Sequence, residues 1–183
     1  QGDMIANAVA GLSRLIDQER VLVSSADIPL LTGEVVQQFL DECARSGADV
    51  CYPVVERSVM EARFPGSGRS YRPLRDGHFA GGDLCLVNPR VALTNLEMAA
   101  QLASARKSAW KIVRLFGPKI ILKFLTRRLT IADAERKGDE VFHCRCKAII
   151  CRYPEIGMDV DKLHQFHMVE ETLIGRKSQG ARI

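Results

Sequence analysis

Several features that would point directly to a function are absent from this chain of 183 residues. It contains no stretch of about 18 uncharged apolar residues, so we expect no transmembrane helix. The amino terminus lacks the charged and then apolar pattern of a signal peptide. Neither a Gly-x-Ser-x-Gly motif nor a glycine-rich phosphate loop of the common types is present. The sequence therefore gives no support to a membrane-spanning protein, a nucleophile-elbow hydrolase or a P-loop enzyme.

Aromatic residues are also few, at 6% of the chain, and the net charge of +4 is small. Much of the positive charge lies between Arg106 and Arg128, without the interleaving of aromatic residues that favours nucleic-acid binding, so we expect no nucleic-acid partner. A basic amphipathic segment of this kind can lie on a membrane surface. We prefer the more common arrangement, in which the segment packs on its own domain, and therefore expect no membrane contact.

The cysteines show no pattern that assigns a metal site. They sit mostly inside apolar runs, where a free thiol behaves as a small hydrophobe, and a reduced cytoplasmic setting is the simplest account. His143 and its neighbours Cys144, Cys146 and Cys151 are of the types that bind zinc. No second Cys-x-x-Cys or histidine pair is available to close a site with four ligands, so we expect no structural zinc.

What the sequence does contain is the alternation of strand and helix patterns of an α/β domain. We expect a strand at 21–23, a helix at 32–46 and a strand at 49–55, which together form a βαβ unit with parallel strands. The polar residues 56–70 are expected to form a mobile loop. Further expected elements are a first helix at 3–16, a hairpin from 71–74 and 83–87 around Asp76-Gly77, broken helices over 89–138, a long strand at 141–152 and a last helix from 163.

Local signals support some of these boundaries. Thr32 can cap the second helix, and Gly47 is a natural place for it to end. Thr130 with Asp133 resembles a capping box. Gly81 and Gly82 precede the second arm of the hairpin, where they allow a close approach of the backbone or a positive φ.

Two acidic sites carry the chemistry that we expect. Asp27 follows a buried strand and precedes a helix, and Asp159 and Asp161 occupy the corresponding place near the end of the chain. If both strands lie in one sheet, the carboxylates converge at its edge, where open α/β sheets bind ligands. Mg²⁺ takes oxygen ligands of this kind and shares its shell with substrate phosphates. The alternative is that Asp27 orders its turn and that Asp159 and Asp161 cap the last helix.

Three stretches of the sequence are similar to one known family. Val21 to Thr32 (Val-Leu-Val-Ser-Ser-Ala-Asp-Ile-Pro-Leu-Leu-Thr) resembles the strand and acidic Asp-x-Pro turn of the MobA-like nucleotidyltransferases. Met158 to Phe166 resembles the family's closing motif, an Asp or Asn before the last helix. Phe79 to Val87 is similar to its glycine-containing strand beside the acceptor site. The resemblance covers most of the chain, with 89–138 as a longer helical insert than usual.

The resemblance implies a fold and a reaction. The fold would be a GT-A-like (Rossmann-like) three-layer α/β/α sandwich with a mostly parallel sheet. The domain would span residues 1–174, followed by a flexible tail at 175–183. The reaction would transfer a nucleotidyl group from a nucleoside triphosphate to a small phosphorylated acceptor, with Mg²⁺ as cofactor and pyrophosphate as the leaving group.

The same resemblance assigns roles to individual residues. Asp27 and Asp161 would be the catalytic and metal-binding pair, and Asp161 matches the second ligand better than Asp159 does. The residues expected to border the substrates are Ala26, Pro29, Gly81, Gly82 and Asp83.

The sequence departs from the family's pattern in two places. The family's glycine-rich loop, which binds the triphosphate and the base, would lie upstream of the first helix and is not in this sequence. We therefore expect the chain to be the carboxyl-terminal portion of a longer protein, truncated at the amino terminus of the domain. Lys162-Leu163 also replaces the more usual Thr-Pro of the closing motif.

Two alternatives to a nucleotidyltransferase stay open at this point. Asp159-Val-Asp161 has the Asp-x-Asp form found in nucleotide-sugar glycosyltransferases of the same fold. A non-catalytic interaction module that uses the basic helices 106–128 is the other. The nucleotide base, the acceptor and the oligomeric state are not indicated by the sequence.

Overall fold

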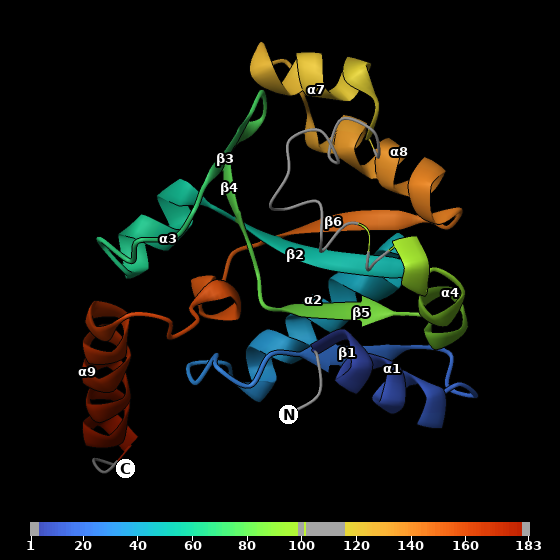
Figure 1. Cartoon of the computed structure of the whole chain (residues 1–183). Helices are drawn as coiled ribbons and strands as arrows, with labels where there is room; N and C mark the ends of the chain where they lie inside the picture. The colour runs from blue at the N-terminus through green and yellow to red at the C-terminus, as the bar shows by residue number, and fades with distance from the viewer. Residues whose placement is uncertain (1–3, 99–100, 102–115, 181–183) are drawn as a thin grey trace.

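The structure is a computed structural model that describes residues 4–98, 101 and 116–180. A single six-stranded sheet lies at its centre (Figure 1). Strand β5 lies between β1 and β2, while β2 also pairs with β4 and β6, and β3 forms a hairpin with β4. The strands are β1 (Val21–Ser24), β2 (Val50–Glu56), β3 (Arg72–Leu74), β4 (Gly77–Gly81), β5 (Leu84–Val87) and β6 (Cys146–Cys151).

The expectation of a mostly parallel sheet is wrong. Only β2 and β6 pair in parallel, and the other four pairings are antiparallel. β1 and β2 do run in the same direction, because each is antiparallel to β5, but β5 separates them. The physical reason is the hairpin at Leu74–Gly77, which turns the chain back so that β4 and β5 run against both neighbours.

Helix α2 (Gly33–Ser46) forms where its local signals predict it. The Thr32 side chain accepts a hydrogen bond from the backbone N–H of Val35, at 3.4 Å. Gly47 ends the helix in a left-handed conformation (φ 59°) that favours glycine, and its N–H bonds the carbonyls of Cys43 and Ala44. The predictions for both ends of this helix are confirmed.

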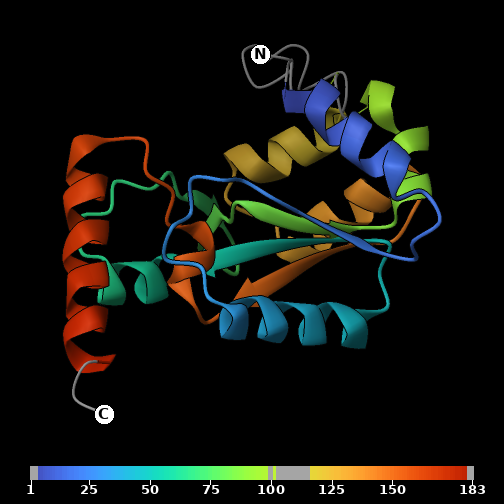
Figure 2. The ribbon, with the colours of Figure 1, turned by 90° about the horizontal axis from the view of Figure 1, so that it is seen from below.

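Helices cover both faces of the sheet (Figure 2). Helix α2 packs on one face, and its buried residues are Val35, Phe39 and Cys43. On the other face α1 (Met4–Arg14) lies against the short α4 (Pro89–Thr94), which Asn88 caps through the N–H groups of Arg90 and Val91. The described helices of the expected insert are thus α4, α7 (Pro118–Leu125) and α8 (Ile131–Phe142). The part of the insert at residues 102–115 lies outside the described residues.

The long strand expected at 141–152 is shorter than predicted. Val141 and Phe142 still belong to α8, which begins with the predicted capping box of Thr130 and Asp133. His143 then takes a left-handed conformation (φ 49°) that ends the helix, and β6 starts only at Cys146. The apolar residues at the end of α8 and those of β6 follow one another closely in the sequence, so together they resemble the pattern of one long strand.

The outer edge of β6 is covered by acidic side chains of α8. Asp139 accepts a hydrogen bond from the N–H of Cys146 at 2.6 Å, and Glu135 accepts one from the N–H of Ala148 at 3.0 Å. The Lys147 ammonium lies 3.0 Å from the same Glu135 carboxylate. Helix α8 thus provides partners for backbone groups that a neighbouring strand would otherwise bond.

Residues 56–70 are not simply a loop, since α3 (Arg57–Arg63) forms at their start. Its Met60 and the following Phe64 are fully buried. The chain beyond β6 passes through a turn of 3-10 helix, η1 (Pro154–Gly157), into the last helix α9 (Leu163–Gly180). This helix extends past residue 174, where we place the start of the tail.

The core lies between α2, α3, η1 and the sheet. Leu30, Val55, Met60, Ile156 and Met158 have no exposed surface. Three of the six cysteines, all of them free thiols, are buried there as small hydrophobes. None of the helices in the described part of the chain is both long enough and apolar enough to span a bilayer.

Candidate active site

Asp27 lies in the turn that follows β1, on the surface of the molecule. The Ser25 hydroxyl donates a hydrogen bond to its carboxylate, and the Ser25 N–H donates to the carbonyl of Asp83 at 2.8 Å. The carbonyl of Asp27 accepts a hydrogen bond from the N–H of Val160 at 3.1 Å. The acidic turn is therefore held against both the start of β5 and the segment that carries Asp161.

Gly81 and Gly82 form the corner between β4 and β5. Gly82 donates its N–H to the carbonyl of Pro53 at 2.9 Å, and Asp83 donates its N–H to the carbonyl of Ile156 at 3.1 Å. A Cβ on Gly82 would lie 2.8 Å from the Pro53 ring, and one on Gly81 would overlap the Tyr52 hydroxyl. Of the two roles expected for these glycines, a close approach of the backbone or a positive φ, the structure shows the close approach.

The segment from Met158 to Asp161 carries the second acidic site. Met158 is fully buried, whereas the side chain of Asp159 is 15% exposed and Asp161 is exposed. Gln165, at the first turn of α9, accepts hydrogen bonds from the N–H groups of Asp161 (3.0 Å) and Lys162 (2.9 Å) through its side-chain oxygen. Its side-chain nitrogen donates to the carbonyl of Ser67 at 3.0 Å. Gln165, which is 2% exposed, fixes this segment to the loop before β3.

Arg69 is the residue that joins the acidic groups. Its guanidinium donates to the Asp159 carboxylate, lies 3.2 Å from the Asp83 carboxylate and donates to the carbonyl of Gly81 at 3.0 Å. The side chain is only 12% exposed, and its Nε has no hydrogen-bond partner among the described residues. Arg69 therefore holds two carboxylates from separate parts of the chain and keeps one donor unused.

The carboxylates affect one another electrostatically. Burial raises the pKa of Asp83 to about 6, the positive charge of Arg69 opposes that rise, and the negative charges of Asp159, Asp27 and Asp161 add to it. Four carboxylates from three segments thus share one region at the end of β1 and the start of β5. The structure brings the predicted residues Asp27, Asp83 and Asp161 together, with Gly81 and Gly82 beside them.

The described residues offer no complete metal cage, since no three histidine, cysteine or acidic side chains are grouped closely enough to hold an ion. Mg²⁺ does not require one, because water and substrate phosphates commonly complete its shell around one or two carboxylates. Asp27 and Asp161 are exposed and suit that arrangement. Asp159 suits it less, because its carboxylate is bonded to Arg69.

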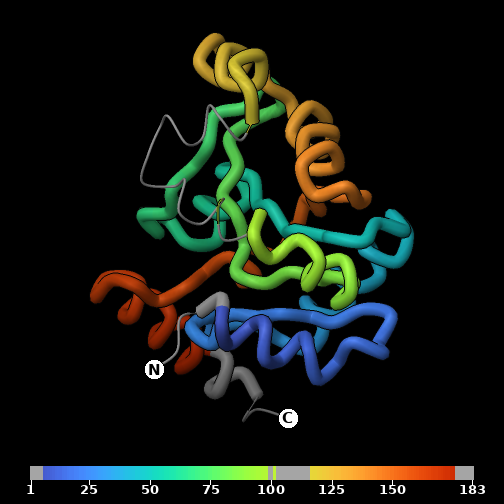
Figure 3. Tube along the Cα trace, turned by 45° about the vertical axis from the view of Figure 1, so that its right-hand side comes forward, coloured from blue at the N-terminus to red at the C-terminus, as the bar shows by residue number. Residues whose placement is uncertain are grey.

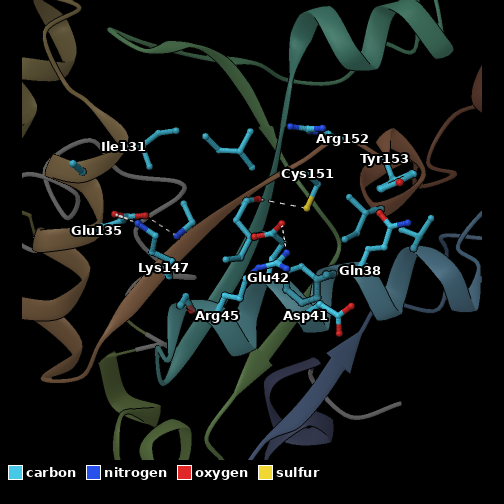
Figure 4. Close-up of a pocket in the computed structure, with 18 residues that line it drawn as sticks. Gln38, Asp41, Glu42, Arg45, Ile131, Glu135, Lys147, Cys151, Arg152 and Tyr153 are labelled. Atoms are coloured by element: carbon cyan, nitrogen blue, oxygen red, sulfur yellow. Dashed lines mark hydrogen bonds and ion pairs between the residues drawn. The ribbon is translucent and has the colours of Figure 1, made fainter.

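A cavity of about 850 Å³ lies elsewhere, between α2, β6 and α8 (Figure 4). None of the four carboxylates lines it. Glu135 of α8 and Lys147 of β6 face each other across part of it, and Glu42 is paired with Arg45 on α2. These charged groups neutralise one another, so we assign no reaction to this cavity.

Comparison with known proteins identifies the family of this chain. The family model described as the MobA-like NTP transferase domain matches residues 1–120, which include Asp27, Arg69 and Asp83. The chain belongs to the MobA-like NTP transferase family. This membership supports an enzymatic function of the nucleotidyltransferase type for the domain, and a nucleoside triphosphate as its substrate.

A solved structure agrees with this family. The chain is similar to a hypothetical transferase from Thermus thermophilus, with 34% sequence identity and a TM-score of 0.82. The similarity covers 90% of this chain and 70% of that one. No curated protein matches the sequence. Asp159 and Asp161 lie beyond the residues that the family model matches.

Sequence reasoning missed Arg69 and Gln165. Arg69 stands in Gly66-Ser67-Gly68-Arg69, a stretch interpreted only as a mobile loop, and its partners lie 14 and 90 residues away. A single arginine in a glycine-rich loop was the one available signal. Gln165 gave no signal, because a glutamine in an amphipathic helix is ordinarily a surface residue.

Proposed function

We propose that this domain transfers a nucleotidyl group from a nucleoside triphosphate to a phosphorylated acceptor and releases pyrophosphate. The supporting observation is the hydrogen bond between the Asp27 carbonyl and the Val160 N–H, which brings the turn of Asp27 beside Asp161. Membership of the MobA-like NTP transferase family supports a nucleoside triphosphate as the donor of that group. We further propose that the sheet and its two helical layers are a GT-A-like arrangement, with the carboxylates at the substrate edge.

In the proposed reaction an acceptor oxygen attacks the α-phosphorus of the triphosphate. The new phosphorus–oxygen bond forms as the bond to the β-phosphate oxygen breaks, and pyrophosphate leaves with that electron pair. Asp27 and Asp161 would hold a Mg²⁺ ion. When bound, this ion would neutralise charge on the phosphoryl oxygens. Gly81, Gly82 and Asp83, together with Ala26 and Pro29, would border the substrates.

Arg69 supports a phosphorylated acceptor over a neutral one. Its one positive charge offsets part of the negative charge of Asp83 and Asp159, so the region is less repulsive to an anion than four unpaired carboxylates would be. The same pairing counts against the glycosyltransferase alternative. The first carboxylate of its Asp-x-Asp motif, Asp159, is bonded to Arg69, so only Asp161 of that motif is left free to hold an ion.

Pyrophosphate release from each nucleoside triphosphate, measured on the full-length protein with Mg²⁺, tests the proposal. We expect Asp27→Asn to lower kcat/KM at least about a hundredfold, since a metal contributes several kcal/mol to such a transition state. Asp41→Asn is the matched control, because Asp41 is an exposed carboxylate on α2 that bonds only Gln37. Equal activity in the two variants would remove Asp27 from the mechanism.

A further inference from the structure

Helix α7 carries the two large aliphatic side chains that are most exposed in the described part of the insert. Leu122 is 63% exposed and Leu125 is 72% exposed, and their spacing of three residues puts them on one face of the helix. Ile120, Ile121 and Phe124 are half-buried on the remaining surface. No residue of α7 is fully buried, and among the described residues the leucine pair is left exposed. The expected packing of the whole basic segment on its own domain stays a prediction, because residues 102–115 lie outside the described part of the chain.

Four exposed arginines come from the two parts of the chain next to the carboxyl end of α7. Arg127 and Arg128 directly follow the helix, and their N–H groups bond the carbonyls of Phe124 and Lys123. Arg72 and Arg75 belong to the β3–β4 hairpin, whose tip reaches α7 (Figure 1). We call Leu122, Leu125 and these four arginines the α7 surface.

Hydrogen bonds join the hairpin to the turn after α7. The N–H of Arg75 donates to the carbonyl of Leu129 at 2.8 Å, and the N–H of Ile131 donates to the Asp76 carboxylate at 2.7 Å. One backbone–backbone hydrogen bond and one bond from a backbone N–H to the Asp76 side chain therefore hold the two sources of positive charge next to each other.

The positive charge of the α7 surface exceeds the negative charge beside it, because the four arginines face one exposed carboxylate of the hairpin, Asp76, which accepts the N–H of Ile131. All four arginines are exposed, and none forms an ion pair with an acidic group in the described part of the chain. The nearby Asp133 is committed to Lys123 at 2.8 Å and to Arg136 at 2.6 Å. The surface therefore presents net positive charge around an apolar centre.

We propose that the α7 surface docks on an anionic lipid membrane. Exposed leucines can enter the boundary between headgroups and acyl chains, while arginines beside them attract the negative headgroups. A nucleic acid fits less well, because the exposed side chains at the centre are aliphatic and cannot stack on bases as aromatic ones do. This inference goes beyond the proposed reaction and does not depend on it.

Co-sedimentation of the full chain with vesicles tests the docking. One set of vesicles contains equal parts of phosphatidylglycerol and phosphatidylcholine, and the other contains phosphatidylcholine alone. We expect partitioning onto the anionic vesicles that weakens at high salt, because salt screens exposed charges. No binding to the anionic vesicles at low salt, or equal binding to both kinds, would overturn the proposal.

Paired variants locate the contact. Arg127→Gln with Arg128→Gln should lower the partition coefficient about 25-fold, which corresponds to about fivefold for each cation. Leu122→Ser with Leu125→Ser should lower it about tenfold through lost apolar insertion. Thermal unfolding checks that each variant is folded. If a double variant does not fold, Leu125→Ser and Arg128→Gln are tested singly.

Matched controls lie outside the α7 surface, and the apolar pair lies on α9, at the far end of the molecule (Figure 3). Leu163 and Ile174 are 72% and 58% exposed, so Leu163→Ser with Ile174→Ser removes a similar apolar area. Arg14→Gln with Arg152→Gln removes the same charge at other exposed positions. An equal loss in these controls would overturn the proposal. Tighter binding to duplex DNA than to the vesicles, unchanged in the Leu122→Ser with Leu125→Ser variant, would overturn it as well.

Discussion

Gln165 joins the loop that carries Arg69 to the segment that carries Asp161. One buried amide satisfies two backbone donors and one backbone acceptor. A buried group that loses its partner costs more than an average hydrogen bond contributes, because its desolvation is no longer offset. The position of Asp161 therefore depends on a residue that would take no part in the reaction itself.

We expect Gln165→Leu to lower the free energy of unfolding by about 1–3 kcal/mol, because two part-buried N–H groups lose their partner and the buried Ser67 carbonyl keeps only His164 beside it. Urea unfolding of the variant and of the unaltered protein measures this difference. Gln38→Leu is the control, since Gln38 makes only an exposed bond to Glu34 on α2. A Gln165 variant as stable as this control would contradict the assigned role.

Asp83 should make stability depend on pH. Burial first, and then the neighbouring carboxylates, raise the pKa of Asp83 in the folded protein from 3.8 to about 6. The folded state therefore binds a proton that the unfolded state has released, and stability falls as pH rises from about 4 through about 6. The contribution is fully present below the unfolded value and is lost above the folded one.

We expect Asp83→Asn to remove this loss, so that the variant gains roughly 2–3 kcal/mol relative to the unaltered protein between about pH 4 and pH 7. Thermal or urea unfolding across this pH range measures the difference. Only the change of that difference with pH is informative, because the substitution also removes the ion pair with Arg69. A difference that is constant with pH would show that the pKa of Asp83 is not raised.

At the scale of elements, the corner between β4 and β5 decides how the sheet meets η1. Gly82 brings the strand backbone against Pro53 of β2 and the carbonyl of Ile156. Any side chain at position 82 must push the corner away from Pro53 and from η1, which leads to the segment of Asp159 and Asp161. The corner thus couples the packing of the sheet to the geometry of the site.

We expect Gly82→Ala to destabilise the protein by about 1–3 kcal/mol, because its Cβ would lie 2.8 Å from the Pro53 ring and 3.1 Å from the Ile156 carbonyl oxygen. Thermal unfolding measures the effect. Gly33→Ala is the control, since a Cβ at the start of α2 meets nothing within 4 Å. Equal melting temperatures for the two variants would mean that the corner is looser than described.

Elements set by neighbouring residues could be predicted from the sequence, and those set by distant ones could not. Thr32 and Gly47 mark the two ends of α2 through hydrogen bonds to residues only a few positions away. Both ends of the helix could therefore be predicted from the local sequence. The direction of β5 depends on pairings with β1 and β2, which lie far away in the chain. A strand of four apolar residues carries no signal for its direction, so the sequence itself did not correct the mostly parallel sheet that the family resemblance implied.

At the scale of the whole molecule, the candidate site also has residues that local sequence could indicate and residues that only the tertiary fold brings in. Asp27 and Asp161 could be proposed because each follows a strand pattern and precedes a helix. Arg69 could not, since only folding brings its loop to carboxylates at Asp83 and Asp159. The exposure of Leu122 and Leu125 is also a tertiary property, because the helical pattern of α7 does not show which of its apolar residues the domain covers.

The covered edge of β6 has a consequence for how copies of this chain behave in concentrated solution. An uncovered edge strand offers its backbone groups to any extended segment and so promotes fibrous aggregates. Glu135 and Asp139 occupy N–H groups on that edge, so these groups are not available to an approaching strand. We therefore expect Glu135→Ala with Asp139→Ala to speed fibrous aggregation in concentrated solution, measured by thioflavin T fluorescence, because the edge of β6 is then open to strand addition.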